Sequence, residues 1–358
     1  MSTENTSTTK LEDGDVSALF PKLTRKDVLS CAFSSWYDKL RHVTFKSVIL
    51  KPLDPSFIEY LLSDGIILPG DDEIPKFGNK IEDDLSEDDG SDWSDYDDDD
   101  SGEKTKMSVN IDSIAAEIRQ AISSLGGRVF PRMGWSAPTD ASWMSSDKTL
   151  QCRNLTEVLT LLKSSDKITE DIDGGSYISK DEMGSWEHEL VLRQWCNLYP
   201  SMEFRCFVRE HELIAISQIE MQHYEFLEGM KDDIEDKISE LFDRHVREAI
   251  DPENYCFDVY ITQESGRAYV IDVKPWSAKI DSCLYLWQEI LELKDEETLG
   301  LRLFPSSIDG MRHYSNKYAA NQFPKDIARE GLQTSIVEFI QKMAIQQANE
   351  DEAQSDES

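Results

Sequence analysis

Apolar and polar residues alternate along this chain with two different periods, which predicts a mixture of helices and strands. Over residues 111–125 apolar side chains recur every three or four positions, as they do on one face of a helix. Gly126 and Gly127 follow directly, and glycine adopts the left-handed conformation that ends many helices. The same period predicts further helices over residues 26–37, 57–62, 155–164, 225–247 and 336–343.

Strands are predicted where apolar residues alternate with polar ones or form short runs bounded by turn residues. These segments are residues 44–50, 189–195, 203–208, 213–218, 256–261 and 268–273. Residues 263–267 contain Gly266 and join two of these segments, as expected for an antiparallel hairpin. Antiparallel hairpins with helices packed on them define the α+β class, which is the predicted fold class.

Charge and composition divide the chain into folded and polar parts. Residues 81–103 hold thirteen Asp or Glu and no Lys or Arg, and a segment this polar cannot offset the entropy lost on ordering. Ser91 and Ser94 lie within it, so it is either a solvated spacer or a phosphorylated docking segment. The chain is predicted to begin with a disordered N-terminus (1–24) and the N-terminal part of the fold (25–69). A disordered acidic insert (70–105) follows, then the main core with a C-terminal helix (106–346) and an acidic tail (347–358).

The net charge of −34 excludes nucleic acid and anionic membrane surfaces as main partners, because both attract basic proteins. Six cysteines are scattered without a C-x-x-C pair, a pattern typical of buried thiols in a reducing compartment. The first residues lack the basic and apolar regions of a signal peptide, and no stretch reaches the ~18 apolar residues of a membrane span. These features predict a soluble, cytoplasmic monomer.

The hairpin formed by residues 256–273 holds the most informative acidic pair. A turn centred on Ser265 places Asp258 directly opposite Asp272, with Cβ atoms about 5 Å apart. Two carboxylates at this distance repel each other by roughly 3 kcal/mol, and Mg²⁺ is the usual compensator. Lys274 points to the same face but cannot bind a metal. The hairpin therefore holds a metal site with a lysine on its rim, or an ion-pair cluster that replaces one; a one-residue register slip would separate the two Asp.

Other charged residues occupy strands and loops of the predicted sheet. Glu203 and Arg205 share a strand face and could form a surface ion pair, whereas Arg193 emerges from a buried strand. Arg132 and Trp135 lie three apart in a loop, where a guanidinium beside an indole can hold a phosphate or serve a structural role. The sequence contains no Walker A motif, no G-x-G-x-x-G and no nucleophile elbow.

In the order and spacing of several motifs the chain resembles the cell division cycle protein 123 family. The resemblance covers roughly residues 26–345 and includes the acidic insert. The motifs are residues 31–37, 43–50, 135–138, 190–196, 203–208, 257–260 and 281–282. Several colinear motifs are more specific than any one of them.

The resemblance implies an ATP-grasp-like fold, in which two α+β lobes hold ATP and Mg²⁺ in a cleft between them. It also implies a chaperone that binds the γ subunit of translation initiation factor 2, promotes assembly of the heterotrimer, and supports translation initiation and cell-cycle progression. The implied nucleotide contacts are Arg132, Trp135, Ala137, Thr139, Arg193, Gln194, Trp195, Cys196, Glu203, Arg205 and Ile219. The implied metal positions are Asp258, Asp272 and Lys274.

Four residues depart from the family pattern. Arg132 replaces Lys and keeps a cation, whereas Thr139 replaces Lys or Arg and Ile219 replaces Arg. Lys274 stands where the family has Asn, a third metal ligand. We therefore predict weaker nucleotide binding, or a metal partly replaced by Lys274. Two alternatives are an ATP-dependent carboxylate–amine ligase and an acidic interaction protein without ATP. The changes at Thr139, Ile219 and Lys274 remove groups that would bind phosphate or metal, which favours the chaperone over the ligase.

Overall fold

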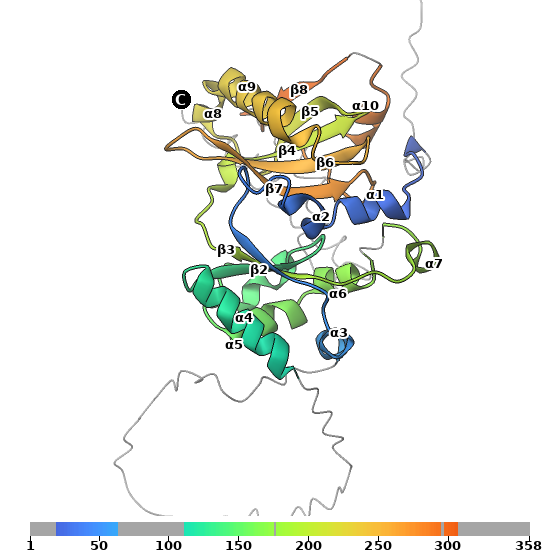
Figure 1. Cartoon of the computed structure of the whole chain (residues 1–358). Helices are drawn as coiled ribbons and strands as arrows, with labels where there is room; N and C mark the ends of the chain where they lie inside the picture. The colour runs from blue at the N-terminus through green and yellow to red at the C-terminus, as the bar shows by residue number, and fades with distance from the viewer. Residues whose placement is uncertain (1–18, 64–110, 175–176, 295–296, 307–358) are drawn as a thin grey trace, which may run out of the picture.

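The computed structural model describes residues 19–63, 111–174, 177–294 and 297–306, and these form two lobes around two sheets (Figure 1). The smaller sheet has the strand order β1-β3-β2 and the larger one β7-β6-β4-β5-β8. Every ladder is antiparallel except β5–β8, which is parallel. The predicted α+β class with antiparallel sheets and packed helices is confirmed.

The small lobe packs helices against its three-stranded sheet. Its strands are β1 (Ser47–Leu50), β2 (Val129–Met133) and β3 (Leu190–Gln194), and its helices are α3 (Pro55–Leu62), α4 (Asp112–Ser124), η2 (Thr139–Met144), α5 (Leu155–Lys163) and α6 (Asp166–Ile172). The short α7 (Lys180–Met183) lies apart from this sheet, and its Met183 belongs to the hydrophobic cluster of the large lobe. Helix α4 ends as predicted: Gly126 and Gly127 have φ angles of 90° and 79°, and the Gly127 amide donates to the Ile122 carbonyl at 2.8 Å. Strand β2 was not predicted as a strand, because Pro131 interrupts it; proline is tolerated there since β2 is an edge strand.

The large lobe packs its helices on the five-stranded sheet. Its strands are β4 (Glu203–Arg209), β5 (Glu212–Gln218), β6 (Tyr255–Ile261), β7 (Ala268–Pro275) and β8 (Gly300–Arg302), and its helices are η3 (Pro200–Met202), α8 (Glu225–Glu228), α9 (Lys231–Leu241), the π-helical η4 (Phe242–Val246) and α10 (Trp287–Leu291). The long helix predicted over 225–247 is broken, because α8 ends at Gly229. Figure 1 shows α9 lying across the sheet.

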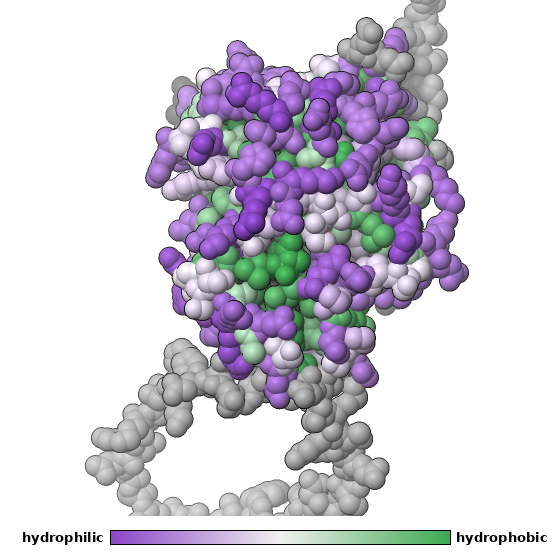
Figure 2. Space-filling view, in the orientation of Figure 1, coloured by the Kyte–Doolittle hydropathy of each residue, from purple (hydrophilic) through white to green (hydrophobic). Residues whose placement is uncertain are grey.

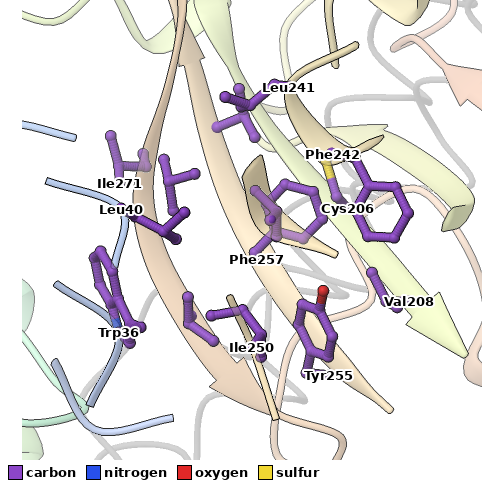
Figure 3. Packing of buried hydrophobic residues seen from close by; sticks show 14 of the residues in the cluster. Trp36, Leu40, Cys206, Val208, Leu241, Phe242, Ile250, Tyr255, Phe257 and Ile271 are labelled. Carbon is purple, nitrogen blue, oxygen red and sulfur yellow. The ribbon is translucent and has the colours of Figure 1, made fainter. Parts of the chain in front are cut away.

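Two short N-terminal helices, α1 (Arg25–Ser30) and α2 (Phe33–Tyr37), lie between the lobes (Figure 1). They replace the single helix predicted over 26–37, because Ala32 is extended and caps α2. Thr24 and Asp27 form a capping box at the start of α1. Figure 3 shows Trp36 and Leu40 beside Ile271 of β7, in the same hydrophobic cluster as Phe257 of β6. The N-terminal segment is thus packed into the core of the large lobe.

Several predictions lie outside the described residues: the acidic insert over 70–105, the C-terminal helix over 336–343, the tail over 347–358 and most of the segment 1–24. Across the part of the chain that the structure describes, none of the helices is long and apolar enough to span a membrane.

Candidate functional site

The acidic pair predicted from the hairpin lies on one face of the large sheet. Asp258 of β6 pairs directly with Asp272 of β7, as predicted. The register shifts by one residue immediately afterwards, where Val259 pairs with Val270, so Ile271 is bulged. The alternative of a register slip that separates the two Asp is therefore wrong, because the shift lies beyond the pair and leaves both carboxylates on the same face.

Three cations neutralise these carboxylates. Arg205 donates from Nε and Nη2 to the two oxygens of Asp258, at 2.7 and 2.9 Å. Arg132 Nη1 lies 2.8 Å from Asp272 Oδ1. Lys274 Nζ contacts Asp272 Oδ2 and lies 3.7 Å from Asp258 Oδ2. We call these five residues the ion cluster; Arg205 pairs with Asp258 and not, as one reading of the sequence had it, with Glu203.

The charges of the ion cluster are tightly coupled. Burial alone would raise the pKa of Asp272, but the charges of Arg132 and Lys274 lower it to about 2. Burial opposes the charge of Arg205, yet the Asp258 carboxylate raises the pKa of this guanidinium well above its usual value. The Asp272 carboxylate is therefore held in the ionised form.

Arg193 extends the cluster into the small lobe. It is 8% exposed, which confirms the prediction that it emerges from a buried strand. Its Nη2 donates to the Ile271 carbonyl at 2.7 Å, which links β3 to the bulge in β7. The guanidinium carbons of Arg193 and Arg132 each lie 5.3 Å from the centre of the Phe33 ring. Burial, reinforced by the charge of Arg132, lowers the pKa of Arg193 to about 9.

Lys167 of α6 is a further cation at this site that the sequence analysis missed. Its Nζ donates to Thr139 Oγ1 at 2.7 Å. Thr139 stands where the family has Lys or Arg, so Lys167 brings a positive charge next to the position that lacks one. Burial lowers its pKa, and the charges of Lys274 and Arg205 act in the same direction although Asp140 opposes them. The only available signal was the helical pattern of residues 166–172, which was not assigned.

The donor set of the ion cluster does not fit a magnesium ion. Lys274 lies between the two carboxylates, and a charged lysine has no lone pair to offer a metal. All four carboxylate oxygens of Asp258 and Asp272 are within reach of Arg132, Arg205 or Lys274. Among the described residues, no three His, Cys, Asp or Glu side chains are grouped closely enough to hold a metal. The geometry matches the second alternative, an ion-pair cluster in place of a metal.

The residues implied as an adenine-side hinge lie where the chain passes from the small sheet to the large one. Gln194 ends β3 and is exposed, and the half-buried Trp195 donates from its indole to Asn197 Oδ1 at 3.0 Å. Cys196 is exposed, so the prediction of a buried thiol was wrong at this position. The other five cysteines are buried as predicted: Cys31, Cys152, Cys206, Cys256 and Cys283.

Glu203, the first residue of β4, and Ile219, which follows the end of β5, are neighbours at one end of the large sheet. The Ile219 amide donates to the Glu203 carbonyl at 3.1 Å. Burial, together with the negative charges of Asp258 and Glu220, raises the pKa of Glu203 to about 7. Two implied nucleotide contacts are thus neighbours here, one apolar and one a carboxyl group that gains a proton easily.

Trp135 and Ala137 lie in the loop after β2, apart from the ion cluster. The Trp135 indole donates to the Val28 carbonyl of α1 at 2.8 Å and the side chain is buried. Its backbone amide donates to Asp171 Oδ2 at 2.8 Å. Ala137 accepts from the Thr139 amide at 2.7 Å. The Trp135 side chain is therefore held by contacts within the protein, whereas the Arg132 side chain forms an ion pair with Asp272.

Comparisons with known proteins show the family to which the chain is related. A family model described as D123 matches residues 36–330. A protein of Aspergillus terreus named "Cell division cycle protein 123" is 35% identical over 294 residues, which cover 79% of this chain and 67% of that protein. A protein of Candida albicans named "Translation initiation factor eIF2 assembly protein" is 34% identical over 340 residues, covering 92% of this chain and 96% of that protein. The solved structure of Cdc123 from Schizosaccharomyces pombe superposes with a TM-score of 0.64 at 31% identity, covering 80% of this chain and all of that one.

Proposed function

Because the chain belongs to the D123 family, we propose that it is an assembly factor for translation initiation factor eIF2. The observation that carries this proposal is the match along almost the full length of the Candida albicans eIF2 assembly protein. We further propose that the chain acts in the cytoplasm as a monomer, binds the γ subunit and helps it join its partners, and so supports translation initiation and cell-cycle progression. The net charge of −34 favours a basic, RNA-handling partner, because opposite charges raise the association rate.

We also propose that ATP binds between the lobes, in an ATP-grasp-like arrangement, with its phosphates at the ion cluster. Support comes from the balance of charge: Arg132, Arg205 and Lys274 outnumber the two carboxylates of the cluster. Arg193 and Lys167 add two more cations at its edges. Figure 2 shows apolar side chains gathered in the middle of the face that it presents, at the level of β2 and β3 in Figure 1. Bound ATP would supply the negative charge that neutralises these cations and fixes the lobes relative to each other.

In this proposal Lys274 takes over the role of Mg²⁺. Its ammonium lies beside both Asp272 and Asp258, and so neutralises the repulsion that a metal would otherwise relieve. The nucleotide then acts as a structural element and is not turned over. A ligase of the ATP-grasp type would need a metal that polarises the phosphates, so the donor set favours the assembly factor.

Reconstitution tests the proposal. The full chain is mixed with purified γ and α subunits of eIF2, and the yield of the γ–α complex is measured with and without ATP. We expect capture of the γ subunit, a higher yield of complex and no sustained release of ADP. Failure to capture the γ subunit contradicts the assembly role. Steady ADP or AMP release with a small amine acceptor supports the ligase instead, and assembly that proceeds equally well without any ATP binding supports the interaction protein.

A further inference from the structure

A pocket of about 500 Å³ opens on the molecule beside α1 and α2. Its walls come from these two helices, the loop after β2, α6 and the extended segment 185–189 that leads into β3. Among the described residues that line it there is no member of the ion cluster, so it is distinct from the proposed phosphate site, although Trp135, an implied nucleotide contact, forms part of its wall. Its volume falls within the range of small-ligand and side-chain pockets.

Glu189 places in this pocket a carboxylate oxygen whose contact with a cation is a long ion pair with Lys51. The side chain is 3% exposed, and its Oε1 accepts from the Ser34 amide at 2.9 Å. Its Oε2 is buried and has no hydrogen-bond partner among the described residues. Lys51 Nζ is 3.4 Å away but donates to Ser34 Oγ at 3.0 Å. Oε2 thus has an ion pair at 3.4 Å but accepts no hydrogen bond among the described residues, and a ligand that brings a donor would complete it.

The backbone of the loop after β2 approaches this carboxylate closely. A Cβ atom at Gly134 would lie 3.3 Å from Glu189 Oε1, so glycine leaves the space that the carboxylate occupies. A second buried carboxylate, Asp171, lines the same pocket and accepts from the Trp135 and Ser136 amides at 2.8 and 2.6 Å. Asp171 and Glu189 thus line the cavity together with the cations Arg25 and Lys51, so it is the Glu189 carboxylate, and not the overall charge of the walls, that would select a cationic ligand.

Aromatic rings form the other wall. The half-buried Trp186 lies 4.8 Å from the His188 ring and 6.4 Å from the Trp135 ring, measured between ring centres. This wall is fixed in place by backbone contacts: Arg25 donates to the Met183 and Ser185 carbonyls, each at 2.6 Å. A half-buried indole in the same pocket as a carboxylate offers a flat cation a ring to stack on.

We propose that this pocket binds an arginine side chain of a partner protein. The guanidinium would donate to Glu189 Oε2 and stack on Trp186, which a planar group with several donors does better than an ammonium. Lys51, whose side chain is 31% exposed, can turn towards water and leave the carboxylate to the ligand. The strong negative charge of the whole chain draws a basic partner to this surface.

The test uses the full chain and three tripeptides: acetyl-Gly-Arg-Gly-amide, the same peptide with citrulline, and the same peptide with lysine. Citrulline has the shape of arginine without its charge. By ligand-observed NMR we expect the arginine peptide to bind at least about tenfold more tightly than the other two. Glu189→Gln should weaken it about tenfold, because the amide keeps the shape but loses the charged acceptor. Trp186→Ala should weaken it severalfold. Glu117→Gln on the exposed face of α4 is the control and should change nothing.

The proposal is overturned if the arginine and citrulline peptides bind equally, if the lysine peptide binds as well, if Glu189→Gln binds like the unchanged chain, or if no binding is seen up to about 10 mM. Circular dichroism of each variant verifies that it is folded. The experiment needs neither ATP nor eIF2 subunits, so its failure is distinguishable from failure of the proposed assembly role.

Discussion

Asp258 and Asp272 face each other across the β6–β7 ladder, and each carboxylate is held by a different arginine. Arg205 comes from the neighbouring strand of the same sheet, whereas Arg132 comes from the small lobe. Like charges directly opposite destabilise a hairpin, so these cations are part of what allows the pairing. The Arg132–Asp272 pair also connects the small lobe to the β6–β7 hairpin of the large lobe. The position of one lobe relative to the other at the proposed nucleotide site therefore depends on this pair.

Loss of Arg205 should leave a buried charge without its partner. For Arg205→Met we expect the free energy of unfolding to fall by about 3 kcal/mol, because Asp258 is 5% exposed and cannot recover its hydration. Urea unfolding at neutral pH measures this. The double variant Arg205→Met with Asp258→Leu should recover most of the loss. Arg244→Met, which breaks an exposed pair with Glu240, serves as the control and should have little effect. A single Arg205→Met variant as stable as the unchanged chain would contradict the buried pair.

Lys274 should determine whether nucleotide binding depends on a metal. Because its ammonium already compensates Asp258 and Asp272, we expect ATP affinity to differ by less than about threefold between EDTA and excess Mg²⁺. Lys274→Asn removes that charge and adds an oxygen ligand, so Mg²⁺ should then raise the affinity at least about tenfold. Isothermal titration with ATP measures both.

The control for this experiment is Lys231→Asn on the exposed start of α9, which should behave like the unchanged chain. Binding of Mn²⁺ without nucleotide, followed by electron paramagnetic resonance, adds an independent reading: the unchanged chain should bind weakly and Lys274→Asn more tightly. Strongly Mg²⁺-dependent ATP binding by the unchanged chain would show that Lys274 does not stand in for the metal.

The predictable part of this site is local in sequence. The Asp258–Asp272 pair follows from the spacing of two strands joined by a short turn, and so the register could be worked out from the sequence. The bulge at Ile271 could not, because nothing in the hairpin's own sequence marks it; Ile271 packs in one cluster with Trp36 and Leu40, residues more than two hundred positions away along the chain (Figure 3). Pairing within one hairpin is set by its turn, whereas packing between segments is set by the whole core.

The partner of Arg205 illustrates the same limit. Glu203 was the nearest acidic residue on its strand face, but the partner is Asp258, 53 positions away. Lys167 was missed for a related reason: α6 is a short helix, and only the fold brings it beside Thr139. Helix breaks at Ala32 and Gly229 were missed because each helical pattern continues through them.

Lys167 should contribute to nucleotide affinity more than to stability. Although Lys167 is an exposed residue, partial burial of its ammonium and the charges of Lys274 and Arg205 lower its pKa, and a phosphate beside it would offset the repulsion from these cations. For Lys167→Met we therefore expect ATP to bind about tenfold more weakly, with the midpoint of urea unfolding unchanged or slightly raised. Lys180→Met, which breaks an exposed pair with Asp173, is the matched control. Equal ATP affinity in Lys167→Met and the control would remove Lys167 from the site.

Asp171 should make the stability of the protein depend on pH. Burial raises its pKa to about 7 in the folded state, although the Trp135 and Ser136 amides and Arg132 oppose the shift, whereas an unfolded Asp has a pKa of about 3.9. The folded state therefore binds this proton more tightly, so the stabilising contribution is complete below about pH 4 and is lost as the pH rises towards 7. The reverse sign would hold for a carboxyl group whose pKa is lowered on folding.

The variant Asp171→Asn isolates this effect, because the amide oxygen can still accept from the two backbone amides that the carboxylate now holds. Between pH 5 and 7 the free energy of unfolding of the unchanged chain should fall relative to that of the variant, by up to about 1.4 kcal/mol per pH unit. Denaturant unfolding at pH 5, 6 and 7 gives the comparison, with Asp173→Asn at the exposed end of α6 as control. Parallel pH profiles for Asp171→Asn and the unchanged chain would show that this carboxyl group is ionised as readily when folded as when unfolded. A diverging profile would identify Asp171 as a group whose charge the fold disfavours, in the wall of the pocket it shares with Glu189.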